Sequence, residues 1–173
     1  MLKLIGSLFF ALGSAFFVYT YNDEEKEKIK KNENILRLIQ LVNMNVLEKK
    51  MVLADAFFGT KGRISKYIDT FLEEYLKLKK DSEALNKYNQ REIIIDFMKD
   101  YFIDCNPEIL ENAVNYIAIL GLVDKKTSLE NFNLVLKDCE NIILNIKEEC
   151  KKNIKLTRTI TYAIASVTIL VLL

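Results

Sequence analysis

The hydrophobic positions of this chain follow a helical period over most of its length. The longest run is near the C-terminus, where apolar residues recur in alternating three- and four-residue steps. Its members are Leu129, Phe132, Leu136, Cys139, Ile143, Ile146 and Cys150. This alternation predicts one long helix that packs against other helices. No proline or glycine interrupts it, and no charged side chain follows Arg158.

Both ends of the chain are apolar enough to enter a membrane. The stretch from Leu4 to Tyr21 has close to the roughly 20 residues that a helix needs to cross the hydrocarbon core. The C-terminal stretch is shorter and reaches across only with little tilt. We therefore predict a transmembrane helix at 1–21, a cytoplasmic helical bundle at 22–158 and a transmembrane helix at 159–173. A cleaved signal peptide is the alternative for the first segment, with Gly13-Ser14-Ala15 as its small-residue site.

The basic residues set the predicted orientation. Lysine and arginine flank the inner end of each apolar segment, at Lys26, Lys28, Lys30, Lys31 and Arg37 and at Lys147, Lys151, Lys152, Lys155 and Arg158. Because positive flanks stay on the cytoplasmic side, the middle of the chain is expected in the cytoplasm and both termini outside.

Three features delimit the first half of the middle domain. Asn22 or Asp23 is a candidate cap for a helix that runs to about Leu53 and grows out of the first span without a break. The segment 57–62 holds a phenylalanine pair and two glycines and predicts a loop. These two phenylalanines either belong to the hydrophobic core beneath the loop or form a binding patch. From Ile64 to Leu76 the apolar spacing predicts the clearest amphipathic helix of the chain.

The second half of the domain has stronger local signals. A fourth helix is expected from about Glu83 to Ile103. Asn106-Pro107 is a helix start, because asparagine caps and proline suits the first helical position. Gly121 is expected to stop that helix and Asp124 to cap the last one. The prediction is an all-α antiparallel bundle with the first and last helices side by side.

Composition excludes several classes of function. Lys and Arg number 25 and Asp and Glu 24, so the chain lacks the basic excess of a nucleic-acid binder. It has no histidine and three cysteines, which predicts reduced thiols and neither a metal site nor a disulfide scaffold. No catalytic signature or phosphate loop is present. We expect no enzyme activity, no cofactor and no small-molecule substrate.

Two sets of residues are candidates for binding. Asp96, Asp100 and Asp104 recur once per turn and are predicted to meet a basic partner; a solvated helix face is the alternative. Small residues in the first span allow close approach of another helix, although such residues are common in spans. They are Gly6, Ser7, Ala11, Gly13 and Ala15.

The order of several short motifs resembles the stage III sporulation protein AB family. The first motif is the opening MLKLIGSLFFALGSAFF. The segment Leu53-Ala54-Asp55-Ala56-Phe57 is similar to the family's L-x-x-A turn, and Leu120-Gly121-Leu122-Val123-Asp124 is similar to its LG-x-x-D junction. The remaining motifs are Pro107-Glu108-Ile109-Leu110 and Lys155-Leu156-Thr157-Arg158. Departures are Asn43 and Asn45 in place of glutamate, Ser128 in place of glutamine, and Thr157 and Thr161 in place of tyrosine and glycine.

That resemblance implies a non-enzymatic membrane subunit of the complex joining mother cell and forespore. It also implies that the bundle resembles the cytoplasmic domain of type II secretion F platform proteins. Its partners would be other subunits of the stage III sporulation complex, including its ATPase. A membrane-tethered adaptor that recruits a cytosolic protein without any channel is the alternative.

Overall fold

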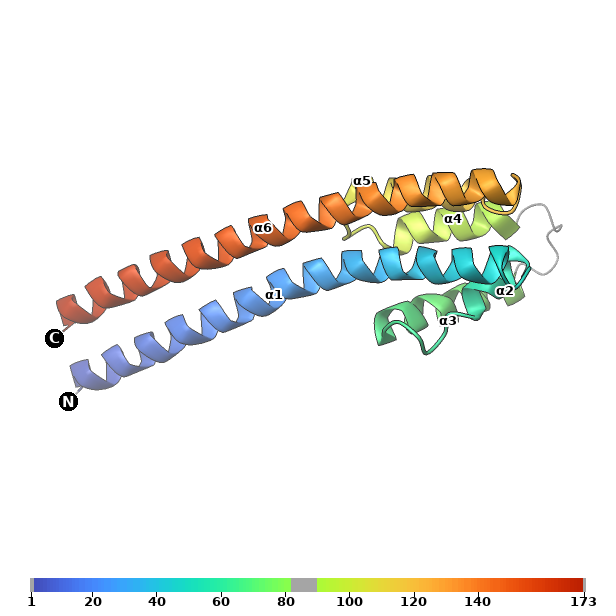
Figure 1. Ribbon diagram of the computed structural model, residues 1–173. Coiled ribbons are helices and arrows are strands. Elements are labelled where there is room, and N and C mark those ends of the chain that lie inside the picture. Colours follow the sequence, from blue (N-terminus) through green and yellow to red (C-terminus); the bar gives the residue numbers. More distant parts are fainter. Residues whose placement is uncertain (1, 82–89, 173) are drawn as a thin grey trace. The chain divides into compact units, whose positions relative to one another are not determined.

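The computed structural model describes residues 2–81 and 90–172, and all the regular structure in them is helical (Figure 1). The helices are α1 (Leu2–Leu47), α2 (Leu53–Phe58), α3 (Lys66–Asp81), α4 (Gln90–Tyr101), α5 (Pro107–Ile119) and α6 (Lys125–Leu172). The all-α prediction is confirmed. The predicted start of the fourth helix, at Glu83, lies outside the described residues.

The chain divides into two compact units. The helix-pair unit contains residues 1–29 and 144–173, which are the first part of α1 and the last part of α6. The bundle unit contains residues 30–143.

In the helix-pair unit, α1 and α6 run side by side in opposite directions (Figure 1). Cys150 of α6 contacts Glu25 of α1. Further along, Thr161 of α6 lines a groove together with Ser14 of α1. Because the residue number rises along one helix while it falls along the other, the pair is antiparallel, as the sequence predicts.

The first helix has no cap at Asn22 or Asp23. α1 continues through both residues as one helix of 46 residues, so the expectation of an unbroken helix is confirmed and that of a cap there is wrong. Val18 and Glu25, on either side of this position, are both buried, and Glu25 contacts Cys150 of α6. No glycine or proline lies between Gly13 and Gly59 to interrupt the helix.

The end of α1 is also earlier than predicted, at Leu47 and not near Leu53. Lys50 adopts a left-handed conformation with φ of 55°, and the Met51 amide donates to the Asn45 carbonyl at 3.1 Å. These are the features of a helix C-terminus that closes with a left-handed residue. The chain then forms the short helix α2, which is not predicted from the sequence and which includes Phe57 and Phe58, the first two residues of the predicted loop at 57–62.

A cluster of aromatic rings forms part of the core of the bundle unit. The Phe71 ring of α3 lies 5.2 Å from Phe97, 5.3 Å from Tyr101 and 4.8 Å from Phe102 between ring centroids. Phe57 of α2 is fully buried, and its ring centroid lies 6.5 Å from that of Phe71. The core interpretation of this phenylalanine is therefore confirmed.

Side-chain hydrogen bonds join α1 to the elements around it. The Tyr116 hydroxyl of α5 donates to the Asn43 side chain, and the Asn45 amide donates to the Ala56 carbonyl at 2.9 Å. A Cβ at Gly59 would lie 2.9 Å from that same amide nitrogen, so the close approach requires glycine there. The two asparagines at the family's glutamate positions thus have structural partners in this chain.

The junction between α5 and α6 follows the predicted signals. Asn106 Oδ1 accepts from the amides of Glu108 and Ile109. Gly121 has φ of +78°, a conformation that glycine adopts without strain. Asp124 Oδ1 accepts from the amides of Lys126 and Thr127, both at 3.0 Å.

Candidate interaction surfaces

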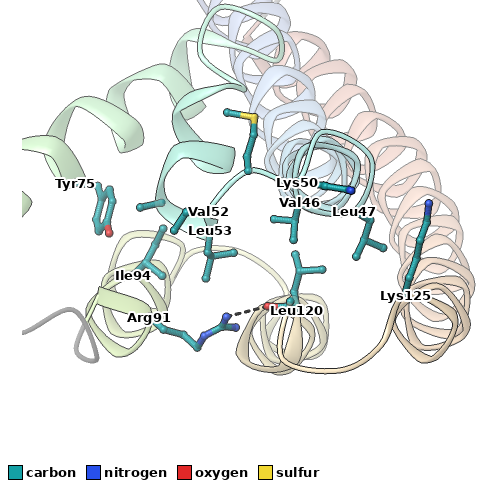
Figure 2. A pocket seen from close by; sticks show the side chains of 13 residues that line it. Val46, Leu47, Lys50, Val52, Leu53, Tyr75, Arg91, Ile94, Leu120 and Lys125 are labelled. Carbon is teal, nitrogen blue, oxygen red and sulfur yellow. Dashed lines mark hydrogen bonds between the residues drawn. The ribbon is translucent and has the colours of Figure 1, made fainter.

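One candidate site in the bundle unit is a cavity of about 460 Å³ between the turn after α1 and the junction before α6 (Figure 2). Its wall is mainly aliphatic and comes from α1, α2, α4 and the end of α5, through Val46, Leu53, Ala54, Ile94 and Leu120. Three cationic residues line it as well, namely Lys50, Arg91 and Lys125. None of the described residues that line it is acidic.

Arg91 has a structural role in the wall of this cavity. Its guanidinium donates to the carbonyl oxygens of Ile117, Ala118 and Leu120, with the last two bonds at 3.0 and 2.8 Å. The final carbonyls of a helix have no partner within the helix. Arg91 of α4 therefore caps α5 from outside, and Figure 2 shows its bond to Leu120.

The three predicted aspartates are not on one helix. Asp96 and Asp100 are exposed on α4, but α4 ends at Tyr101 and Asp104 lies in the following turn. Asp104 is 3.4 Å from Lys31 of α1, and Asp96 is 3.9 Å from Lys99. Because these pairs are largely exposed, they contribute little to stability. The expectation that the stripe contacts a basic partner stays a prediction.

The small residues of the N-terminal apolar segment divide between two faces of α1. Ser7 and Ala11 are partly covered, whereas Gly6, Gly13 and Ala15 are exposed. A Cβ added at either glycine would meet no atom within 4 Å. An open groove lined by Phe10, Gly13, Ser14, Phe17, Thr161 and other residues runs beside this helix pair. Packing against a further transmembrane helix is still a prediction.

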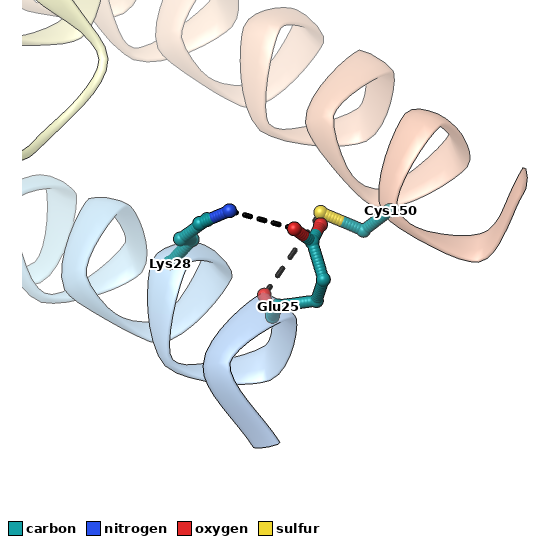
Figure 3. A network of polar contacts seen from close by, with 3 residues as sticks. All are labelled: Glu25, Lys28 and Cys150. Atoms are coloured by element: carbon teal, nitrogen blue, oxygen red, sulfur yellow. Dashed lines mark hydrogen bonds and ion pairs between the residues drawn. The ribbon is translucent and has the colours of Figure 1, made fainter. Parts of the chain in front are cut away.

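A polar cluster joins α1 and α6 within the helix-pair unit (Figure 3). The Glu25 residue is only 4% exposed, and its carboxylate lies 2.6 Å from the Lys28 ammonium. The Cys150 thiol donates to the Glu25 carbonyl oxygen at 3.9 Å. Burial raises the pKa of the Glu25 carboxyl, but hydrogen bonds from Cys150 and Lys28 outweigh it, so that pKa lies below its ordinary value.

The three cysteines are free and buried. Burial raises the pKa of both the Cys139 and the Cys150 thiol to about 11. Such thiols stay protonated at neutral pH and behave as small hydrophobic groups. Two of them lie on the apolar seam of α6, as the sequence analysis predicts.

α6 contains a candidate membrane span. Among the described residues, one helix is long and apolar enough to cross a bilayer, and it is α6. Only 6% of its most apolar stretch is buried inside the structure. Its exposed apolar residues include Leu156, Ile160, Ile164, Val167, Leu170 and Val171. The apolar character expected of the C-terminal segment is therefore present on the outer surface of this helix.

The comparisons with known proteins agree with the sequence motifs. The sequence model of the stage III sporulation protein AB family matches residues 3–173, nearly the whole chain. No curated protein and no solved structure matches. The family consists of sporulation proteins and is not a known enzyme family. The match connects this chain with stage III of sporulation. The chain belongs to the stage III sporulation protein AB family.

Proposed function

We propose that the protein is a non-enzymatic structural membrane subunit of the complex that connects mother cell and forespore. In this proposal both apolar helical segments span the mother-cell membrane, and the bundle unit is cytoplasmic. Other subunits of the complex, including its ATPase, dock on that unit. Membership of the family supports a role of this protein in sporulation. The apolar surface of the helix-pair unit and the distribution of charge support its placement in the membrane.

The observation that carries the proposal is the outward-facing apolar surface of the helix-pair unit. Phe9 and Phe16 of α1 are 70% and 69% exposed, and Val171 of α6 is 79% exposed. A contiguous apolar surface of this kind is unfavourable in water and marks a membrane or protein interface. In a bilayer the same side chains contact lipid, and helices satisfy their own backbone groups there.

The distribution of charge supports the orientation. Lysine and arginine are concentrated just inside both apolar segments, and none follows Arg158. This bias favours a cytoplasmic location for the residues between the spans. A docking role of the bundle unit also agrees with the expected resemblance of this domain to platform components of secretion systems.

Deletion of the gene in the source organism tests the proposed function. We expect spores that survive heat to fall by several orders of magnitude while vegetative growth stays normal. Complementation with the intact chain should restore them, and complementation with a chain lacking residues 159–173 should not. Normal numbers of heat-resistant spores after the deletion would contradict a required role in sporulation.

Purification from sporulating cells separates a subunit from a tethered adaptor. A structural subunit should co-migrate in mild detergent with other membrane proteins of the complex. An adaptor would exchange freely and migrate alone. Exclusive migration as a single chain would favour the adaptor.

A further inference from the structure

We propose that the cavity of Figure 2 binds an acidic segment of another polypeptide, with an aliphatic side chain inserted between Leu53, Ile94 and Leu120 and carboxylates placed at Lys50 and Lys125. This proposal deepens the proposed function and rests on it, because a structural subunit acts through the partners that it binds.

The shape of the cavity favours a side chain as its occupant. Its volume of about 460 Å³ and its aliphatic wall resemble the pockets that receive an anchoring side chain at the centre of an interface. The apolar surface also extends past the cavity. Val52 is 65% exposed and Leu122, next to the lining residue Gly121, is 71% exposed. A ligand that covers this rim has to be larger than the cavity, as a polypeptide segment is.

The charges around the cavity favour an acidic occupant. Arg91 is already engaged by three carbonyl oxygens. Lys50 lies in the turn after α1, and Lys125 is the first residue of α6 (Figure 2). Neither has a carboxylate within 4 Å among the described residues. Asp124, the acidic residue beside Lys125, is engaged as the cap of α6. Electrostatic complementarity then selects partners with carboxylates.

The backbone at Lys50 is a separate observation. Its φ of 55° lies in the left-handed region, which disfavours a residue with a Cβ and which glycine adopts without strain. Strained residues of this kind concentrate at sites where the side chain is used. This conformation closes the C-terminus of α1, and in the proposal the ammonium group of Lys50 also contacts the partner at the mouth of the cavity.

The experiment uses the full chain in mild detergent and three blocked peptides with a neutral fluorophore. The first peptide has two leucines flanked on each side by two glutamates. The second replaces the leucines with serines, and the third replaces the glutamates with lysines. Fluorescence anisotropy measures their binding to the natural chain, to a double variant with Lys50→Glu and Lys125→Glu, and to the control Lys137→Glu, an exposed α6 position outside the cavity.

We expect the glutamate–leucine peptide to bind the natural chain and the control equally. Its affinity for the double variant should fall at least about tenfold, since like charges then face each other. The double variant should instead prefer the lysine–leucine peptide. This exchange of preference requires a folded variant, so it separates lost binding from lost folding. Binding of the glutamate–serine peptide should be weaker than that of the glutamate–leucine peptide.

Three results would overturn the proposal. Absence of binding by the glutamate–leucine peptide is one, and equal binding by the double variant is another. The third is a change in the oligomeric state of the protein on charge reversal, which would make a second copy the occupant. None of these results alters the sporulation phenotype of a deletion, so failure here is distinguishable from failure of the proposed function.

Discussion

Replacing Phe71 with alanine should lower the free energy of unfolding of the bundle unit by about 3–5 kcal/mol. The side chain is fully buried, and its ring contacts aromatic rings from α2 and α4 and from the residue that follows α4. The substitution therefore leaves a cavity between three parts of the unit. Small domains are stable by about 5–15 kcal/mol, so this single change removes a large share of the total.

Hydrogen exchange of the full chain in detergent, measured at increasing urea concentration, reports this effect separately for each helix. The amides of α2, α3 and α4 should lose protection together. The neighbouring Thr70→Ala variant is the control, because Thr70 is exposed and bonds only to the Lys66 carbonyl. We expect a change of about 0.5 kcal/mol or less for it. Equal protection in the Phe71 variant and the control would contradict the described core.

Replacing Arg91 with methionine should destabilise the bundle unit by about 2–3 kcal/mol. The substitution removes hydrogen bonds from a charged donor to three carbonyl oxygens at the end of α5. Bonds to charged groups contribute about 1.5–3 kcal/mol each. The total is smaller than their sum because Arg91 is half-buried and water reaches part of the site. Methionine retains most of the aliphatic contact, so the loss reports the bonds.

The same exchange experiment checks this prediction. Protection should fall first at the C-terminal turn of α5 and at the junction that follows it. Arg91→Lys should recover less than half of the stability, because an ammonium group lacks the planar fork of a guanidinium. Arg63→Met is the matched control, since Arg63 is exposed. A loss below about 0.5 kcal/mol for Arg91→Met would show that the cap contributes little.

Features encoded by neighbouring residues could be predicted from the sequence. Asn106 and Asp124 cap the helices that directly follow them, because an asparagine or aspartate side chain reaches the next backbone amides on its own. The seam of α6 could also be predicted from spacing, although Leu129 at its start is 39% exposed. Spacing gives the face of a helix but not how far its neighbours cover that face.

Features that depend on distant residues could not be predicted. Arg91 contacts carbonyls 26 to 29 positions away, and nothing near it in the sequence marks that role. The left-handed residue at the end of α1 is a lysine, whereas the usual sequence signal for such an end is glycine. The helix α2 has six residues, which is too few for a periodic pattern.

The candidate sites show the same division. Asp96 and Asp100 lie on one helix as their spacing indicates, but a helix end that spacing cannot reveal separates Asp104 from them. The cavity was missed because its wall combines residues that lie far apart in the sequence, on several helices and in the turns between them. The sequence holds pairs of lysines at 49–50 and 125–126, but the first pair falls inside the helix that was predicted to run to about Leu53.

In the proposed arrangement both apolar segments cross the membrane and leave the bundle unit in the cytoplasm. Labelling of single introduced cysteines with a membrane-impermeant maleimide in intact cells tests it most directly. The natural cysteines are buried and give a low background. The positions are Leu2→Cys and Val171→Cys near the two ends and Lys66→Cys, which is exposed at the start of α3.

We expect Leu2→Cys and Val171→Cys to react in intact cells and Lys66→Cys to react only after the membrane is permeabilised. Labelling of Lys66→Cys in intact cells would place the bundle unit outside. Loss of the Leu2→Cys site from the mature protein would show a cleaved signal peptide. Either result would contradict the two-span arrangement on which the proposed function depends.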